Sequence, residues 1–220
     1  MEYNVERHTS TEIIAVEIHS GTIHIPSFLT TEEQQALARR CVEIGSQPAG
    51  FYVPVVRGGK YMSIKICCLG RHWNPKTYTY ETTRCDYDGL PVQELPEDLK
   101  DFARRAAVEA GMRIEPDICL VNYYPDGARL GLHQDKDERP ETIEAGIPVV
   151  SISLGDSAKF MIGGTKRSDA VRTIILESGD ALVMGGASRL RYHGVSRVLA
   201  GSGPKQLDVL GRFNLTFRQY

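Results

Sequence analysis

The sequence predicts an α+β protein whose second half forms an all-β core. Helical patterns occur only before residue 112, whereas short apolar segments follow one another from residue 116 onward. Turn sequences rich in Gly and Asp, such as PDG, ESGD and GGAS, separate these segments. Roughly seven or eight short strands in this arrangement are typical of a sandwich or barrel of the jelly-roll kind. The length of 220 residues is enough for one compact domain with a full core.

The first expected elements are a hairpin and a helix. Residues 11–25 alternate in polarity and turn at Ser20 and Gly21, which predicts a β-hairpin. Thr30 followed by Glu33 forms a capping box, in which each side chain accepts a hydrogen bond from the backbone N–H of the other residue. The sequence after it therefore predicts a helix that ends at Gly45.

A strand, a loop and a second helix follow. Residues 61–70 (YMSIKICCLG) predict a strand, and the aromatic and basic residues 71–89 predict a loop. The second helix is expected to begin at Pro96, with acidic residues in its first turn, and to end at Gly111. The residues it is expected to bury are Leu99, Phe102, Ala106 and Ala110. The later strands are expected within residues 118–124, 128–135, 148–155, 159–164, 172–177, 180–186 and 210–219.

The composition predicts a globular protein that does not enter membranes. The longest apolar runs, such as residues 147–154, are far too short to cross a bilayer, and the charged N-terminal stretch predicts no secretory signal. Five cysteines without a CxxC pair argue against disulfides and a zinc ribbon, so we expect a protein of the reducing cytoplasm. We also expect a monomer. The net charge of −2 and the pI near 6.3 argue against nucleic-acid binding.

The stretch LGLHQDKDE at residues 130–138 carries a candidate metal site. Side chains at i and i+2 of a strand share a face, so His133 and Asp135 point together while Leu130 and Leu132 point to the other side. His193, near the end of a later strand, can complete a site of two histidines and one carboxylate. The HxD pattern alone is weak evidence, because a surface pair beside a turn looks the same.

The last strand, RFNLTFR, has two different faces. Period 2 places Arg212, Asn214, Thr216 and Arg218 on one face and Phe213, Leu215 and Phe217 on the other. An edge strand with a solvated polar face would show the same pattern. Inside a barrel, however, two arginines need anionic partners, because a buried unpaired charge is costly. A dicarboxylate beside a ferrous ion would supply them, since arginine grips carboxylates bidentately.

These motifs together resemble the AlkB family of iron- and 2-oxoglutarate-dependent dioxygenases. The similarity covers about residues 117–219, through VNYYPDGARLGLHQDKDE, PVVSISLGD, GGTKRSD, SGDALVMGGASRLRYHGV and GRFNLTFRQ. It implies a double-stranded β-helix core over residues 113–220, preceded by an N-terminal extension and nucleotide-recognition lid over residues 1–112. Together the two parts would form one compact catalytic domain. It also implies that the protein uses Fe(II), 2-oxoglutarate and O2.

The resemblance also implies roles for individual residues. His133, Asp135 and His193 would bind Fe(II), and Arg218 would lie against Asp135 and the metal-bound end of the co-substrate. The residues expected to hold 2-oxoglutarate are Asn122, Tyr124, Arg212 and Asn214, with Arg212 on the distal carboxylate. Asp137 and Glu138 are expected beside the damaged base. A carboxylate roughly 4 Å from a cationic methylated base would gain about 4 kcal/mol before desolvation, whereas undamaged bases are neutral.

The loop GRHWNPKTYTYE is the expected substrate side. Trp73 is surrounded by polar and basic residues, a poor setting for burial, and is expected to stack a flipped base, with His72 as the alternative. Tyr78 or Tyr80 is expected to contact the phosphate. Arg167 matches a family position near the substrate. Met184 departs from the family, in which a tryptophan is often found near the iron.

The expected activity is oxidative demethylation of N1-methyladenine and N3-methylcytosine in single-stranded DNA or RNA, with release of formaldehyde, succinate and CO2. The low pI and the loosely matching lid keep a second hypothesis open, namely a related oxygenase that acts on a protein or a small molecule. A third hypothesis is a jelly-roll binding module with structural histidines, because such folds also serve as binders.

Overall fold

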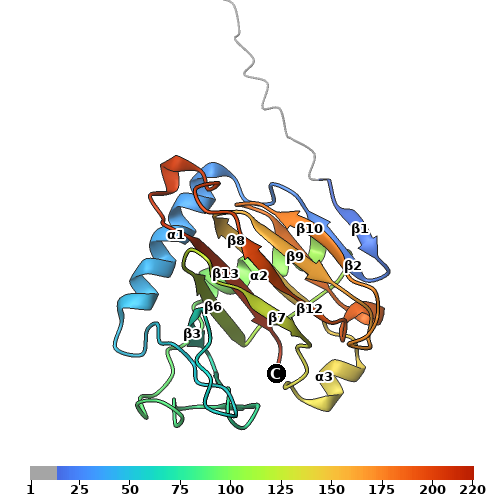
Figure 1. Cartoon of the computed structure of the whole chain (residues 1–220). Coiled ribbons are helices and arrows are strands. Elements are labelled where there is room, and N and C mark those ends of the chain that lie inside the picture. Colours follow the sequence, from blue (N-terminus) through green and yellow to red (C-terminus); the bar gives the residue numbers. More distant parts are fainter. Residues whose placement is uncertain (1–13) are drawn as a thin grey trace, which may run out of the picture.

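Two antiparallel sheets pack face to face in the computed structural model, which describes residues 14–220 (Figure 1). The seven-stranded sheet has the order β1 (Val16–His19), β2 (Thr22–Ile25), β11 (Ala181–Met184), β8 (Val149–Gly155), β13 (Arg212–Arg218), β6 (Ile118–Tyr124) and β3 (Lys65–Leu69). The four-stranded sheet has the order β10 (Arg172–Leu176), β9 (Ala158–Ile162), β12 (His193–Val198) and β7 (Leu130–His133). One apolar cluster takes side chains from both sheets, which confirms the predicted jelly-roll core.

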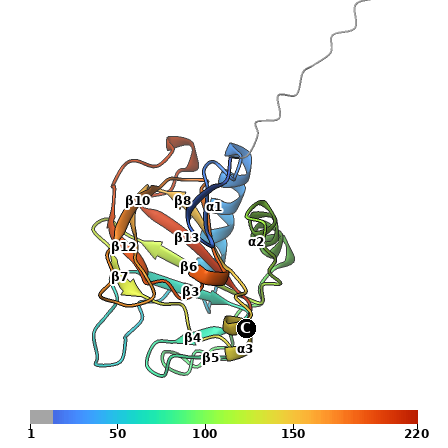
Figure 2. The same cartoon turned by 90° about the vertical axis from the view of Figure 1, so that its right-hand side faces the viewer.

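Two helices cover the outer face of the large sheet (Figure 2): α1 (Thr31–Ser46) and α2 (Glu97–Glu109). The predicted capping box starts α1, since Thr30 N donates to Glu33 Oε2 at 2.9 Å and Glu33 N donates to Thr30 Oγ1 at 3.2 Å. The helix ends one residue beyond Gly45. Helix α2 buries Leu99, Ala103, Ala106 and Ala107, while Phe102 and Ala110 are only partly buried.

Strand β13 lies between β8 and β6, so its predicted alternation separates a core face from a cavity face. Phe213, Leu215 and Phe217 pack into the cluster beneath the helices. Arg212, Asn214, Thr216 and Arg218 point between the two sheets, where they line a cavity. The alternative of a solvated edge strand is wrong, because β13 is paired on both sides and all its residues are buried.

The structure corrects the predicted elements in two places. The aromatic loop contains a two-stranded sheet, β4 (His72–Asn74) and β5 (Thr79–Glu81), joined by a turn in which Tyr78 has a φ of 61°. After residue 116, where only strands were expected, a short helix α3 (Pro140–Glu144) and two 3-10 turns, η1 (Gly186–Ser188) and η2 (Lys205–Leu207), occur. Helix α3 begins with proline, whose fixed φ suits the first turn of a helix.

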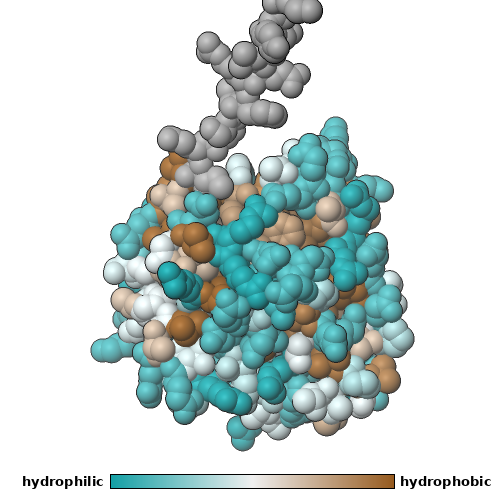
Figure 3. All heavy atoms as spheres, turned by 180° about the vertical axis from the view of Figure 1, so that it is seen from behind, coloured by the Kyte–Doolittle hydropathy of each residue, from teal (hydrophilic) through white to brown (hydrophobic). Residues whose placement is uncertain are grey.

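The predicted hairpin is present as β1 and β2, although residues 11–13 lie outside the described part. Strands β1, β2 and β3 join the same sheet as later strands, so the division of the chain at residue 112 stays a prediction. Four cysteines are buried and only Cys85 is exposed, all of them free. The face seen in Figure 3 is mostly hydrophilic with scattered hydrophobic residues. Within residues 14–220 no helix has the length and apolar character that a membrane span requires.

We expect Leu215→Ala to destabilise the protein by roughly 2–5 kcal/mol, because truncation of this fully buried side chain of β13 would leave a cavity between the sheet and the helices. Urea unfolding followed by circular dichroism measures the change. The control is Val108→Ala on α2, whose side chain is 66% exposed, with an expected change of about 0.5 kcal/mol or less. Equal effects of the two substitutions would contradict the assigned core.

Candidate active site

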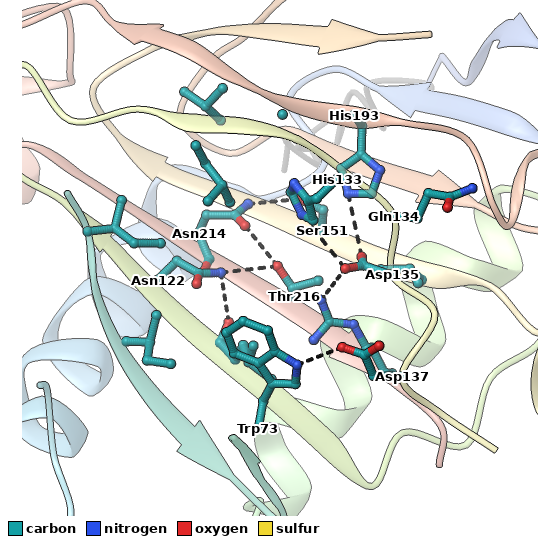
Figure 4. Close-up of a pocket in the computed structure, with 18 of the residues that line it drawn as sticks. Trp73, Asn122, His133, Gln134, Asp135, Asp137, Ser151, His193, Asn214 and Thr216 are labelled. Atoms are coloured by element: carbon teal, nitrogen blue, oxygen red, sulfur yellow. Dashed lines mark hydrogen bonds and ion pairs between the residues drawn. The ribbon is translucent and has the colours of Figure 1, made fainter. Parts of the chain in front are cut away.

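A cavity of about 500 Å³ opens between the two sheets, and the predicted site residues line it (Figure 4). Side chains reach it from the inner faces of both sheets, from the segment after β7 and from the β4–β5 hairpin. The predicted residues that line it are Trp73, Tyr78, Tyr80, Asn122, Tyr124, His133, Asp135, Asp137, Glu138, Arg167, His193, Arg212, Asn214 and Arg218. Residues far apart in the sequence therefore meet at one place.

His133, Asp135 and His193 form a compact group of possible metal ligands. Their ligand atoms lie within 4.8 Å of one another, with His133 Nε2 3.8 Å from Asp135 Oδ1 and His193 Nε2 3.5 Å from Asp135 Oδ2. Each histidine donates from Nδ1 to a carbonyl, that of Gly131 or Arg191, which leaves its Nε2 facing the group. His193 begins strand β12 and pairs with His133 across the sheet, rather than ending a strand as predicted.

A bulge in β7 changes which residues share a face with His133. His193 pairs with His133 and Val195 with Leu130, so three steps along β7 match two steps along β12. The extra residue turns Leu130 toward the cavity, together with His133. The predicted placement of Leu130 on the opposite face is therefore wrong, because strict alternation holds only in a regular strand.

The electrostatics of the group suit a divalent cation. Burial, and then the nearby His193, lower the pKa of His133 to about 4, so its imidazole is neutral near pH 7. Burial would raise the pKa of the Asp135 carboxyl, but Arg218 and His193 outweigh it and hold this pKa well below its ordinary value. Asp135 Oδ2 is buried without a hydrogen-bond partner. Two imidazoles and one carboxylate are the ligand set of non-haem Fe(II) oxygenases, and His133, His193 and Asp135 fit that ion.

Arg212 marks the deep end of the cavity and fits a carboxylate. Its guanidinium is fully buried and donates to Asp156 O at 3.0 Å, Leu176 O at 3.2 Å and Ser153 Oγ at 2.6 Å. Its Nε has no partner, and no carboxylate of the described residues forms an ion pair with it. Burial lowers the pKa of Arg212 to about 10, an effect that Tyr124 opposes. A buried cation in this state would be stabilised by an anionic ligand.

A chain of hydrogen-bonded polar side chains from β6, β13 and β8 lines the cavity (Figure 4). Asn122 Nδ2 donates to Thr216 Oγ1 at 3.3 Å, Thr216 Oγ1 donates to Asn214 Oδ1 at 2.9 Å, and Asn214 Nδ2 donates to Ser151 Oγ at 2.7 Å. The sequence reading missed Ser151 and Ser153. Their signal was present, because they are the only polar residues of β8 and stand at alternate positions in PVVSISLG.

Arg218 is the centre of a buried ionic cluster. It lies 2.6 Å from Asp135 Oδ1 and 3.0 Å from Glu138 Oε1, and it donates to the Tyr80 hydroxyl at 3.1 Å. The carboxylate of Glu138 has no exposed surface and also pairs with Arg189 at 2.8 Å. Glu138 and Tyr80 thus have partners within this cluster although both line the cavity, and their contacts with a base and a phosphate stay predictions. Two arginines form ion pairs with Glu138, and Tyr80 is 8% exposed.

The mouth of the cavity is formed by the β4–β5 hairpin and the segment after β7. Trp73 Nε1 donates to Asp137 Oδ2 at 2.8 Å, and the Tyr78 ring lies 6.3 Å from the Trp73 ring (Figure 4). Burial raises the pKa of Asp137, although the Trp73 hydrogen bond opposes this. Arg167 donates to Leu132 O at 2.8 Å at the cavity edge.

His72 and Met184 differ in their relation to the cavity. His72, the alternative stacking residue, is fully buried on the other face of β4 and bonds Asp86 at 2.5 Å, so this alternative is wrong. The reason is the strand itself, since neighbouring side chains of β4 point to opposite faces. Met184 of β11 lines the cavity as an apolar wall.

Comparison with known proteins agrees with this geometry. Residues 21–218 match the 2OG-Fe(II) oxygenase superfamily. The alpha-ketoglutarate-dependent dioxygenase AlkB of Escherichia coli is 38% identical, over 91% of this chain and 90% of that protein. The chain belongs to the AlkB family. Another AlkB-like relative, the DNA N(6)-methyladenine demethylase ALKBH1C of Arabidopsis thaliana, is 38% identical over 92% of this chain and 49% of that protein.

The solved structure of OsALKBH1 superposes with a TM-score of 0.88 at 37% identity, covering 94% of this chain and all of that one. The chain spans about half the length of the plant demethylases it matches. The AlkB family uses Fe(II), 2-oxoglutarate and O2, and the histidine–carboxylate group and the unpaired Arg212 fit the first two of these.

We expect His133→Ala to abolish stoichiometric binding of Mn(II), used here as a stable substitute for Fe(II), because two ligands cannot hold the ion as three do. Electron paramagnetic resonance of free Mn(II) measures the loss. The control is His24→Ala, since His24 pairs with Asp180 away from the cavity and its removal should leave the stoichiometry unchanged. Retained Mn(II) binding in His133→Ala would speak against this metal site.

Proposed function

We propose that this protein oxidatively demethylates N1-methyladenine and N3-methylcytosine in single-stranded DNA or RNA. The observation that carries the proposal is one cavity that holds three groups in sequence: an unpaired buried arginine, a metal-ligand group and an aromatic–carboxylate pair at the mouth. The relatives named as a DNA demethylase and as AlkB support this reading. Formaldehyde, succinate and CO2 would be the products.

In this mechanism His133, Asp135 and His193 would hold Fe(II), and Arg212 would bind the distal carboxylate of 2-oxoglutarate. When bound there, iron and 2-oxoglutarate would supply the O2 activation that hydroxylation of an N-methyl group requires. The polar chain of Asn122 and Asn214, with Tyr124 beside Arg212, orients the co-substrate along the cavity. Arg218 keeps Asp135 ionised, because its guanidinium stabilises the carboxylate form.

The mouth of the cavity provides recognition of the base. Trp73 offers an aromatic face for stacking a base that has left its strand. Asp137 Oδ2 accepts from Trp73, which leaves the other oxygen for the damaged base, and its charge favours the cationic methylated form. Tyr78, 44% exposed, and Arg167 lie where a phosphate of the same strand would pass. We assign the β4–β5 hairpin as the nucleotide-recognition lid of a monomeric cytoplasmic protein.

A second candidate is an oxygenase of the same chemistry that acts on a protein or a small molecule. The net charge of −2 favours it, because a nucleic-acid substrate is normally met by a basic surface. Salt dependence separates the two. Phosphate contacts release counterions, so binding of a single-stranded oligonucleotide should weaken steeply as salt rises.

Incubation with Fe(II), 2-oxoglutarate and oligonucleotides that carry N1-methyladenine or N3-methylcytosine is expected to yield formaldehyde and the unmethylated base. The same assay on single- and double-stranded DNA and RNA of matched sequence identifies the preferred polymer. Omission of 2-oxoglutarate and unmethylated oligonucleotides are the controls. Absence of demethylated product on every strand would falsify the proposal, and turnover of 2-oxoglutarate on a peptide instead would favour the second candidate.

We expect Asp137→Asn to lower kcat/KM for N1-methyladenine by about tenfold to a hundredfold, since the substitution removes a charge beside a cationic base. Asparagine can still accept from Trp73, so the geometry of the mouth is retained. A neutral substrate, N6-methyladenine, should change by less. Glu144→Gln on α3, an exposed acid outside the cavity lining, is the control. An equal loss on both substrates would show that charge recognition is not the role of Asp137.

A further inference from the structure

Arg189 is a buried arginine that the mechanism above does not use. It follows η1, four residues before His193, and its side chain is 3% exposed. It lies outside the cavity lining, behind the segment that connects β7 to α3. A buried guanidinium is costly unless it is paired and hydrogen-bonded, so its contacts indicate its purpose.

All three nitrogen atoms of Arg189 have partners. Nε donates to Ile147 O at 2.9 Å, Nη1 donates to Asp135 O at 2.5 Å, and Nη2 donates to Glu138 Oε2 at 2.8 Å. The planar fork therefore joins three segments: the residues before β8, the segment 135–138, and the segment that leads into His193. Arg189 thus connects two of the segments that carry the metal ligands.

Asp135 needs such support, because β7 ends at His133 and its hydrogen-bond ladder does not extend to residue 135. Arg218 holds the side chain of Asp135 at 2.6 Å, while Arg189 holds its backbone carbonyl. Glu138 joins the two arginines, since its oxygens pair with Arg189 and Arg218 separately. The orientation of the Asp135 carboxylate is therefore restrained by a contact to its backbone carbonyl and by a contact to its side-chain oxygen.

We propose that Arg189 is a positioning residue for the metal site. By holding the carbonyl of Asp135 and the carboxylate of Glu138, it aims the Asp135 carboxylate at His133 and His193. Residues that orient metal ligands typically alter metal affinity by about 10- to 100-fold when they are replaced. The inference depends on the proposed metal site and adds a residue to it.

The test is Arg189→Lys in the full chain, with Mn(II) affinity measured by electron paramagnetic resonance and the melting temperature measured without metal. Lysine keeps the charge beside Glu138 but cannot reach both carbonyls. We expect Mn(II) binding about 10- to 100-fold weaker. The matched control is Arg84→Lys, because Arg84 is also buried and donates to Gly50 O at 2.6 Å and to Asp88 Oδ1 at 2.9 Å.

The control should lower the melting temperature while it leaves Mn(II) affinity within about twofold, since Arg84 touches no metal-ligand segment. Unchanged affinity in Arg189→Lys would overturn the inference. If that variant does not fold, the Mn(II) affinity of the double variant Arg189→Met, Glu138→Gln is compared with that of Glu138→Gln alone. The double variant leaves no unpaired buried carboxylate at residue 138. Equal affinities in that pair would also overturn it. Failure of the unaltered protein to bind Mn(II) would contradict the proposed function instead.

Discussion

The ion pair between Arg218 and Asp135 is the interaction on which the rest of the site depends. Both groups are buried, and removing either ion from water costs several kcal/mol, a cost that the pairing of opposite charges offsets. The pair also joins the end of the inner strand β13 to the segment beyond β7. Two parts of the chain that are 83 residues apart are thereby held together, with the Asp135 carboxylate facing the two histidines.

The same strand stabilises the fold and forms the site. One face of β13 packs Phe213, Leu215 and Phe217 beneath the helices, and the other presents Arg212 and Arg218 to the cavity. Pairing on both sides keeps β13 regular, so its backbone fixes the distance between Arg212 and Arg218 at its two ends. The separation of the co-substrate end from the metal end is therefore set by backbone geometry.

Sequence reasoning was accurate where strands are regular and paired on both sides. It placed β6, β8 and β13, and it grouped His133, Asp135 and His193 from spacing together with a family resemblance. It was wrong where a strand departs from strict alternation, as with Leu130, or where a strand was taken for a loop, as with His72. The bulge opposite Val195 and the contacts of Arg189 depend on long-range packing, which no local pattern encodes.

The hydrogen bond from Trp73 to Asp137 has an evolutionary consequence. The indole restrains the acid, and in the proposed function it would also form the stacking surface, so the two positions would change together. Replacement of the tryptophan by phenylalanine would preserve an aromatic plane yet release the carboxylate to rotate or to take up a proton. A descendant of this protein that altered its preferred lesion would therefore have to exchange both side chains together.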